Sequence, residues 1–177
     1  MKVFKHSSII LFIFFSFGTL LLQGCNNNNT NRIRFNPKAA PPPYDQSQAV
    51  RDTTLSGGIK IYVIKEGTGP YKVTPNDQIQ VKYTGRTANG KVFTTTYTKN
   101  SITSNSTNIT DLYPYPERNS SPLVEGLRRG LLGMQEGEKR IIRVPPSMGY
   151  TSSGTSIHGV NVYNKTLVYD VQLVKIY

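Results

Sequence analysis

Apolar and polar side chains alternate along several short stretches of the chain, as they do in strands that bury one face. Residues 59–63, 78–83 and 166–176 show this pattern clearly, since Ile, Val, Leu or Tyr occupies every second position there, in the last stretch as far as Leu173. Residues 139–144 form a further short run of mixed apolar and basic residues that favours a strand. We expect these stretches to build an antiparallel sheet.

A tight turn is expected at Ala88-Asn89-Gly90, because Asn-Gly favours the left-handed backbone angles of a type I′ hairpin. The return strand then runs from Lys91 to about Tyr97 and places Val92 and Phe93 on opposite faces. Residues 98–121 are rich in Ser, Thr and Asn, so we predict an irregular connection. Loops of this length tend to be functional or mobile.

One helix is predicted close to residues 122–132. Ser121 can cap its first turn, where Pro122 is tolerated, and Gly133 is expected to end it. The apolar face repeats every four residues, at Leu123, Leu127 and Leu131. Strands, hairpins and one helix together indicate an α+β fold.

The first 25 residues have the pattern of a targeting segment. Lys2 and Lys5 precede an apolar run at residues 9–22, which is shorter than the roughly 20 residues that a membrane-spanning helix needs. Leu22-Gln23-Gly24-Cys25 resembles a bacterial lipobox, in which the signal peptide is cleaved before the cysteine. The alternative is an ordinary signal peptide or an uncleaved anchor with a chance cysteine.

The lipobox resemblance implies three segments. Residues 1–24 would be the signal peptide, residues 25–56 a lipidated Cys25 followed by a flexible tether, and residues 57–177 the folded domain. Such a protein would sit in a bacterial cell envelope, anchored by lipid. Asn26 lacks the Asp that signals inner-membrane retention in enterobacterial lipoproteins, which favours the outer membrane facing the periplasm.

Composition excludes some kinds of chemistry. The sequence holds one cysteine and two histidines, His6 and His158, so no His/Cys metal cluster is possible and we expect no metal and no cofactor. The formal net charge is +11. The basic residues are scattered, however, which favours a solvated basic surface over a nucleic-acid site.

Three motifs in order carry a family resemblance: VKYTGRTANGKVF, LVEGLRRGLLGMQEGEKRIIRVPPSMGY and TLVYDVQLVKI. Together they resemble the FKBP-type peptidyl-prolyl isomerases and span about residues 57–177. The resemblance implies a curved antiparallel sheet wrapped around one short helix. It also implies an isomerase that acts on proline-containing polypeptides, here exported ones, without cofactor or metal.

The resemblance also assigns site residues. It implies a catalytic set in an apolar aromatic pocket, with the Val124 backbone N–H donating to the substrate carbonyl and the Tyr150 hydroxyl reaching the substrate. The remaining catalytic positions are Tyr83 and Phe93. The implied substrate-binding positions are Leu123, Leu127, Val160 and Tyr169.

Two other functions remain open. Thr94 stands where the family usually has Asp, and Leu127 where it has Trp, which are features of a binding or assembly module with little or no turnover. A third interpretation is a surface lipoprotein that binds polyanions, which would make binding strongly salt-dependent.

Overall fold

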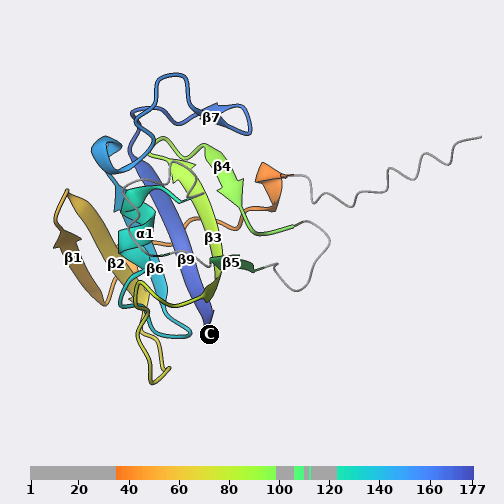
Figure 1. Ribbon diagram of the computed structural model, residues 1–177. Coiled ribbons are helices and arrows are strands. Elements are labelled where there is room, and N and C mark those ends of the chain that lie inside the picture. The colour runs from red at the N-terminus through yellow and green to blue at the C-terminus, as the bar shows by residue number, and fades with distance from the viewer. Residues whose placement is uncertain (1–34, 99–105, 110–111, 113–122) are drawn as a thin grey trace, which may run out of the picture. The chain divides into compact units, whose positions relative to one another are not determined.

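The central element of the computed structural model, which describes residues 35–98, 106–109, 112 and 123–177, is a seven-stranded antiparallel sheet (Figure 1). The strand order is β1-β2-β6-β9-β3-β4, and β5 also pairs with β3. The strands of this sheet are β1 (Arg51–Leu55), β2 (Ile59–Lys65), β3 (Ile79–Thr87), β4 (Val92–Thr95), β5 (Thr107–Ile109), β6 (Lys139–Val144) and β9 (Leu167–Ile176).

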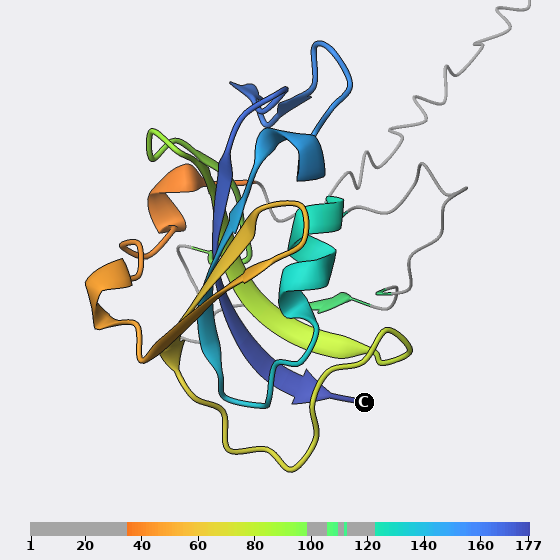
Figure 2. The same ribbon diagram turned by 90° about the vertical axis from the view of Figure 1, so that its left-hand side faces the viewer.

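The remaining elements are short. A two-stranded hairpin joins β7 (Ser156–Ile157) to β8 (Val160–Asn161), and the one α-helix of the described residues is α1 (Glu125–Leu131). Three 3-10 turns complete the set, η1 (Pro37–Ala39), η2 (Gln46–Gln48) and η3 (Pro146–Met148). In Figure 2, α1 lies on one side of the sheet and the orange segment that contains η1 and η2 lies on the other. The α+β prediction, a curved antiparallel sheet against one short helix, is confirmed.

Helix α1 lies close to β6 because two glycines face the strand. A Cβ on Gly126 would lie 2.3 Å from Val144 Cγ1, and one on Gly130 would lie 2.5 Å from Ile142 Cγ2. Both distances are too short for real carbon contacts. The spacing of four residues puts both glycines on one helix face, so this face lets the helix backbone approach the sheet.

The helix begins later than the sequence prediction. Val124 is its N-cap and keeps an extended conformation, with φ −67° and ψ 149° and no side-chain cap. Ser121 and Pro122, the expected cap and first turn, lie outside the described residues. The predicted end is close to the observed one, since Leu132 is the C-cap and Gly133 has φ +72°.

The prediction of a flexible tether up to residue 56 is wrong for residues 35–56. Strand β1 pairs in antiparallel register with β2, and the segment before it crosses the face of the sheet opposite α1. There the carbonyl oxygen of Pro41 accepts a hydrogen bond from Arg86, which is also ion-paired with the buried Asp170. Residues 35–56 are therefore held by backbone hydrogen bonds and by the buried Arg86–Asp170 pair, although their sequence has almost no pattern of apolar residues.

The type I′ prediction at Asn89-Gly90 is also wrong. Gly90 has φ +84°, but Asn89 is not among the described residues with positive φ. The Gly90 N–H donates to the Thr87 carbonyl, and the pairing of β3 with β4 shifts register next to this turn. Two positive φ angles occur instead at His158 (46°) and Gly159 (78°), which join the paired residues of β7 and β8 and form the I′-like turn.

Residues 98–121 contain a strand that the sequence pattern did not predict. Thr107–Ile109 form β5 and pair with residues 79–81 of β3. The rest of this connection lies largely outside the described residues, as do Cys25 and the whole leader. In the described ranges no helix is long and apolar enough to span a bilayer.

Candidate functional site

Four aromatic rings meet between the sheet and the N-terminal end of α1. Phe93 of β4 contacts Tyr169 of β9 and Tyr150 edge to face, with ring centroids 5.7 Å and 6.4 Å apart. Tyr83 of β3 lies 6.4 Å from Tyr169. Edge-to-face pairs at these separations are favourable beyond the area that they bury. Three neighbouring strands and the loop after η3 therefore build one ring cluster.

The ring cluster has a dry floor and a more accessible rim. Phe93 is 0 % exposed, Tyr169 2 % and Leu127 3 %. Tyr83 and Tyr150 are only half-buried. A ligand from solvent would therefore meet the two rim tyrosines first, and the floor residues determine how apolar the surroundings are.

The hydroxyl of Tyr169 has a partner inside this apolar environment. The Tyr150 and Tyr169 side chains share a hydrogen bond. Burial raises the pKa of Tyr150 and raises that of Tyr169 well above the usual value for tyrosine. Both hydroxyls consequently stay protonated at neutral pH, and the half-buried Tyr150 can take part in hydrogen bonds to a ligand.

Gly85 makes the close approach of the rings possible. A Cβ at this position would lie 2.8 Å from Phe93 Cζ and 2.9 Å from Tyr169 Cε1. Gly85 pairs with Tyr169 on one side and with Thr94 on the other. Gly85 lies within the motif VKYTGRTANGKVF, but the family resemblance assigns it no role. A glycine inside a strand of alternating residues often marks a place where other groups approach the backbone closely, and this pattern could have identified Gly85.

Val124 provides a backbone donor next to the rings. Its side chain is 7 % exposed and belongs to the same hydrophobic core as Phe93 and Leu127. Its carbonyl accepts from the amides of Leu127 and Arg128, both at 3.0 Å. Its own N–H has no acceptor among the described residues, as expected for an N-cap. This amide can therefore bind a carbonyl oxygen of a ligand.

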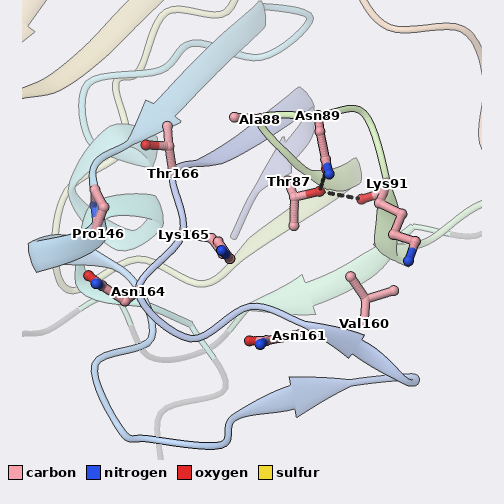
Figure 3. A pocket seen from close by; sticks show the side chains of 10 residues that line it. All are labelled: Thr87, Ala88, Asn89, Lys91, Pro146, Val160, Asn161, Asn164, Lys165 and Thr166. Carbon is pink, nitrogen blue, oxygen red and sulfur yellow. Dashed lines mark hydrogen bonds between the residues drawn. The ribbon is translucent and has the colours of Figure 1, made fainter.

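The other predicted residues lie around this arrangement. Leu123 precedes the helix and, like Tyr83 and Tyr150, packs against the core while partly exposed. Val160 also packs there, but it lines a separate polar cleft of about 450 Å³ beside the β3–β4 turn. Figure 3 shows its side chain directed into that cleft, toward Lys91. Among the ring contacts described above, none involves Val160.

The β7–β8 turn is joined to the ring cluster through a contact that the sequence did not indicate. The His158 ring nitrogen Nδ1 lies 2.9 Å from the Phe93 carbonyl oxygen. Phe35 stacks on the same imidazole, with centroids 4.0 Å apart and planes 8° apart. The contact fixes the hairpin against β4, the strand that carries Phe93.

In the described residues one helix packs on a curved antiparallel sheet, and aromatic residues from β3, β4 and β9 gather at the start of that helix. This arrangement indicates the class of enzyme to which the protein belongs. Residues 69–174 match the family described as FKBP-type peptidyl-prolyl cis-trans isomerase. The chain belongs to this family and is by class a peptidyl-prolyl cis-trans isomerase, an enzyme whose substrates are proline-containing polypeptides.

Individual proteins show the same likeness. The chain is 32 % identical over 132 residues to FK506-binding protein 2 of Candida glabrata, covering 72 % of this chain and 87 % of that protein. It is 30 % identical over 121 residues to the FK506-binding protein of Neisseria meningitidis serogroup B, covering 68 % and 98 %. The crystal structure of FkpA from Escherichia coli superposes with a TM-score of 0.56 at 26 % identity. That match covers 71 % of this chain and about half, 51 %, of the FkpA chain.

Proposed function

We propose that the ring cluster binds an X-Pro segment and accelerates rotation about the bond before the proline. Rotation costs about 18–20 kcal/mol because it breaks amide resonance. The two isomers of an X-Pro bond differ by only about 1 kcal/mol, so both are populated. The high barrier nevertheless makes their exchange slow. A catalyst therefore needs to bind the twisted amide better than the planar forms, with no nucleophile or metal.

The burial of the floor residues supports this mechanism. Water stabilises the polar, resonant amide, and an environment built from Phe93, Leu127 and Tyr169 excludes it. The proline ring would lie against these apolar groups. The Val124 N–H would hold the substrate carbonyl, and the Tyr150 hydroxyl would add a second contact at the rim. The single observation that carries the proposal is this cluster of buried rings beside the Val124 N–H, which has no acceptor in the described part of the chain.

A second function, binding without turnover, is favoured by one observation. Phe93 and Tyr169 are almost completely covered in this structure, so a proline ring would reach the floor only after the rim tyrosines move. Thr94 and Leu127 add to this alternative, because they remove a charge and a large ring that the family usually has. On this account the domain would serve as an envelope binding or assembly module.

A protease-coupled assay on a proline-containing tetrapeptide separates the two functions. The isomerase predicts a rate well above the uncatalysed one, reduced in Tyr150→Ala with the fold intact. A rate equal to the uncatalysed reaction, measured with folded protein, would contradict the enzymatic proposal. Retained turnover in Tyr150→Ala together with loss of a protein partner in pull-down would instead support the binding module.

We further propose that the protein is a lipoprotein of a bacterial envelope and acts on exported proteins. The support is the positively charged start, the short apolar run and the Leu-Gln-Gly-Cys sequence that ends at Cys25. A single acyl chain gives only marginal membrane binding, whereas several chains hold firmly. Labelled fatty acid should therefore enter the wild-type protein but not Cys25→Ser, which should lose membrane association. Equal membrane recovery of both proteins would contradict the lipid anchor, and recovery with the inner membrane would contradict the outer-membrane assignment.

A further inference from the structure

A pocket lies at the C-terminal end of α1, between that helix, β1 and β6. Its volume is about 410 Å³. Three arginines line it, one each from β1, α1 and β6, and its apolar wall is built by two leucines and an isoleucine. These residues are Arg51, Arg129, Arg140, Leu55, Leu132 and Ile61.

The register of the sheet explains why the arginines converge. Arg51 of β1 pairs with Val63 of β2, and Val63 pairs with Arg140 of β6. Residues in one such row point to the same face, which here is the face that α1 covers. Asp52 points to the other face by the alternation of strand β1 and cannot neutralise the row. Arg129 reaches the same region from the last turn of α1 and donates to the Ser56 hydroxyl.

Arg140 has a buried guanidinium, and one of its three nitrogens has no hydrogen-bond acceptor among the described residues. It is 5 % exposed. Its Nη1 donates to the carbonyls of Gly130 (2.9 Å) and Leu132 (3.0 Å), and its Nε donates to Glu138. Nη2 has no acceptor among the described residues. It is also not among their fully enclosed unpartnered atoms, so it retains contact with the pocket.

The other two guanidiniums also keep unused donors. Arg51 uses Nε and Nη2 on Glu66, at 3.3 Å and 3.4 Å, and both partners are 52 % exposed. Its Nη1 has no acceptor in the described part of the chain, and the same is true of Nε and Nη1 of Arg129. An exposed pair with long bonds is weak, so Glu66 can yield Arg51 to a stronger acceptor.

Charge and shape together select the ligand. Three arginines face two carboxylates, Glu66 and Glu138, so the site is short of one negative charge and suits a monoanion better than a dianion. A guanidinium fork matches the two oxygens of a carboxylate. Leu55, Leu132 and Ile61 would cover an aliphatic group attached to it. We propose that this arginine pocket binds a carboxylate carried on a short aliphatic body, either a small organic acid or the C-terminal residue of a polypeptide.

Titration calorimetry or amide chemical shifts with butanoate test the proposal. Wild-type protein should bind butanoate saturably, with shifts at residues 51–55 and 129–133. Arg129→Gln should weaken binding by about tenfold or more, the usual loss when a charged hydrogen bond is removed. Glu66→Gln should tighten it, because Arg51 is released. Both side chains are exposed enough for the variants to fold.

Arg143→Gln is the matched control. Arg143 lies on the same strand as Arg140 but three residues on, where it lines a different cavity on the other face. It should leave butanoate binding unchanged. Equal weakening in Arg129→Gln and Arg143→Gln, or no saturable binding in any protein, would overturn the proposal. Acetate should bind more weakly than butanoate. Equal affinities would show that the apolar wall does not contribute to binding.

N-acetyl-leucine distinguishes the two sources of the carboxylate, since it stands in for a polypeptide terminus. Tighter binding than butanoate identifies the terminus, and weaker binding identifies the small acid. None of these experiments uses a proline peptide, so their outcome is independent of the isomerase assay.

Discussion

The two ends of α1 face the same side of one sheet, yet they have opposite chemistry. At the N-terminal end, β3, β4 and β9 contribute rings, and the polar groups are hydroxyls and the Val124 amide, for which no described residue is an acceptor. At the C-terminal end, β1, α1 and β6 contribute arginines, which lie beside the aliphatic side chains of Leu55, Ile61 and Leu132. A single row of paired residues spans both ends, running through Tyr83, Val171, Arg140, Val63 and Arg51.

This comparison shows how the register of one sheet separates two environments. Val171 is 0 % exposed and lies between the tyrosine end and the arginine end of that row. In the neighbouring row, Ile142 occupies the equivalent place between Tyr169 and Ile61. Buried aliphatic residues therefore keep the charged groups away from the dry ring cluster, where they would stabilise the planar, polar amide.

The largest effect is expected from Phe93→Ala. Phe93 is completely buried at the centre of the ring contacts, so its removal should lower the free energy of unfolding by about 3–5 kcal/mol. Urea unfolding measures this loss. Tyr71→Ala is the control, since Tyr71 is 74 % exposed and should change stability by less than about 0.5 kcal/mol. Similar losses in both variants would mean that the ring cluster is not a packed unit.

Two glycine substitutions compare the ends of the helix directly. Gly126→Ala and Gly130→Ala should each destabilise by about 1–3 kcal/mol, because the added Cβ meets β6 side chains. Gly126 lies in the first turn of α1, two residues after Val124, so its variant should lose more isomerase activity than Gly130→Ala in the peptide assay. Gly130→Ala should instead weaken butanoate binding more strongly. If the two variants lose both properties equally, the ends of α1 do not act separately.

A smaller effect is predicted for Tyr169→Phe. The substitution removes the hydrogen bond to Tyr150 and should cost about 0.5–1.5 kcal/mol, since Tyr150 is half-buried and can bond to water instead. The ring contacts with Phe93 remain. Differential scanning calorimetry checks the stability, and Tyr163→Phe provides a control outside the ring cluster. A loss as large as that of Phe93→Ala would show that the hydroxyl pair, rather than the packing, holds the cluster together.

The smallest change is expected with pH in the neutral range. The pKa values of Tyr150 and Tyr169 are raised by burial, so their contribution to stability is complete below the unfolded pKa of about 10 and is lost as pH rises through the folded values. Stability that depends on these groups should be flat from pH 6 to about 9 and fall above about 10. Urea midpoints measure this, and Tyr169→Phe should reduce the fall. A decline beginning near pH 8 would contradict the assignment.

Strands with one apolar face were the predictable part of the fold. Residues 139–144 were placed correctly, and the alternation in β2 and β9 located the buried residues. Strand β1 escaped because four of its five residues are exposed, so its pairing depends on backbone hydrogen bonds that leave no hydrophobic pattern. The turn at Asn89-Gly90 was assigned the wrong type because the preference of the Asn-Gly dipeptide is local. It does not reflect the register shift between β3 and β4, which changes the turn that connects them.

The ring cluster came from the family resemblance rather than from periodicity. Alternation identified Tyr83 and Tyr169 as buried or half-buried, but it could not bring Tyr150 and Phe93 together across a long loop. Gly85 received no role because its importance lies in distances between two other side chains. The arginine pocket could not be predicted from the sequence for a similar reason. Arg51, Arg129 and Arg140 are far apart in the sequence and meet only through the register of β1, β2 and β6.

The most direct test of the central claim is to follow the Val124 amide by NMR while a short X-Pro peptide is added. We expect the Val124 amide proton to shift, together with signals of Tyr83 and Tyr150, and the cis and trans peptide signals to exchange faster than without protein. Unchanged exchange with folded protein, or shifts confined to the polar cleft around Val160, would contradict it.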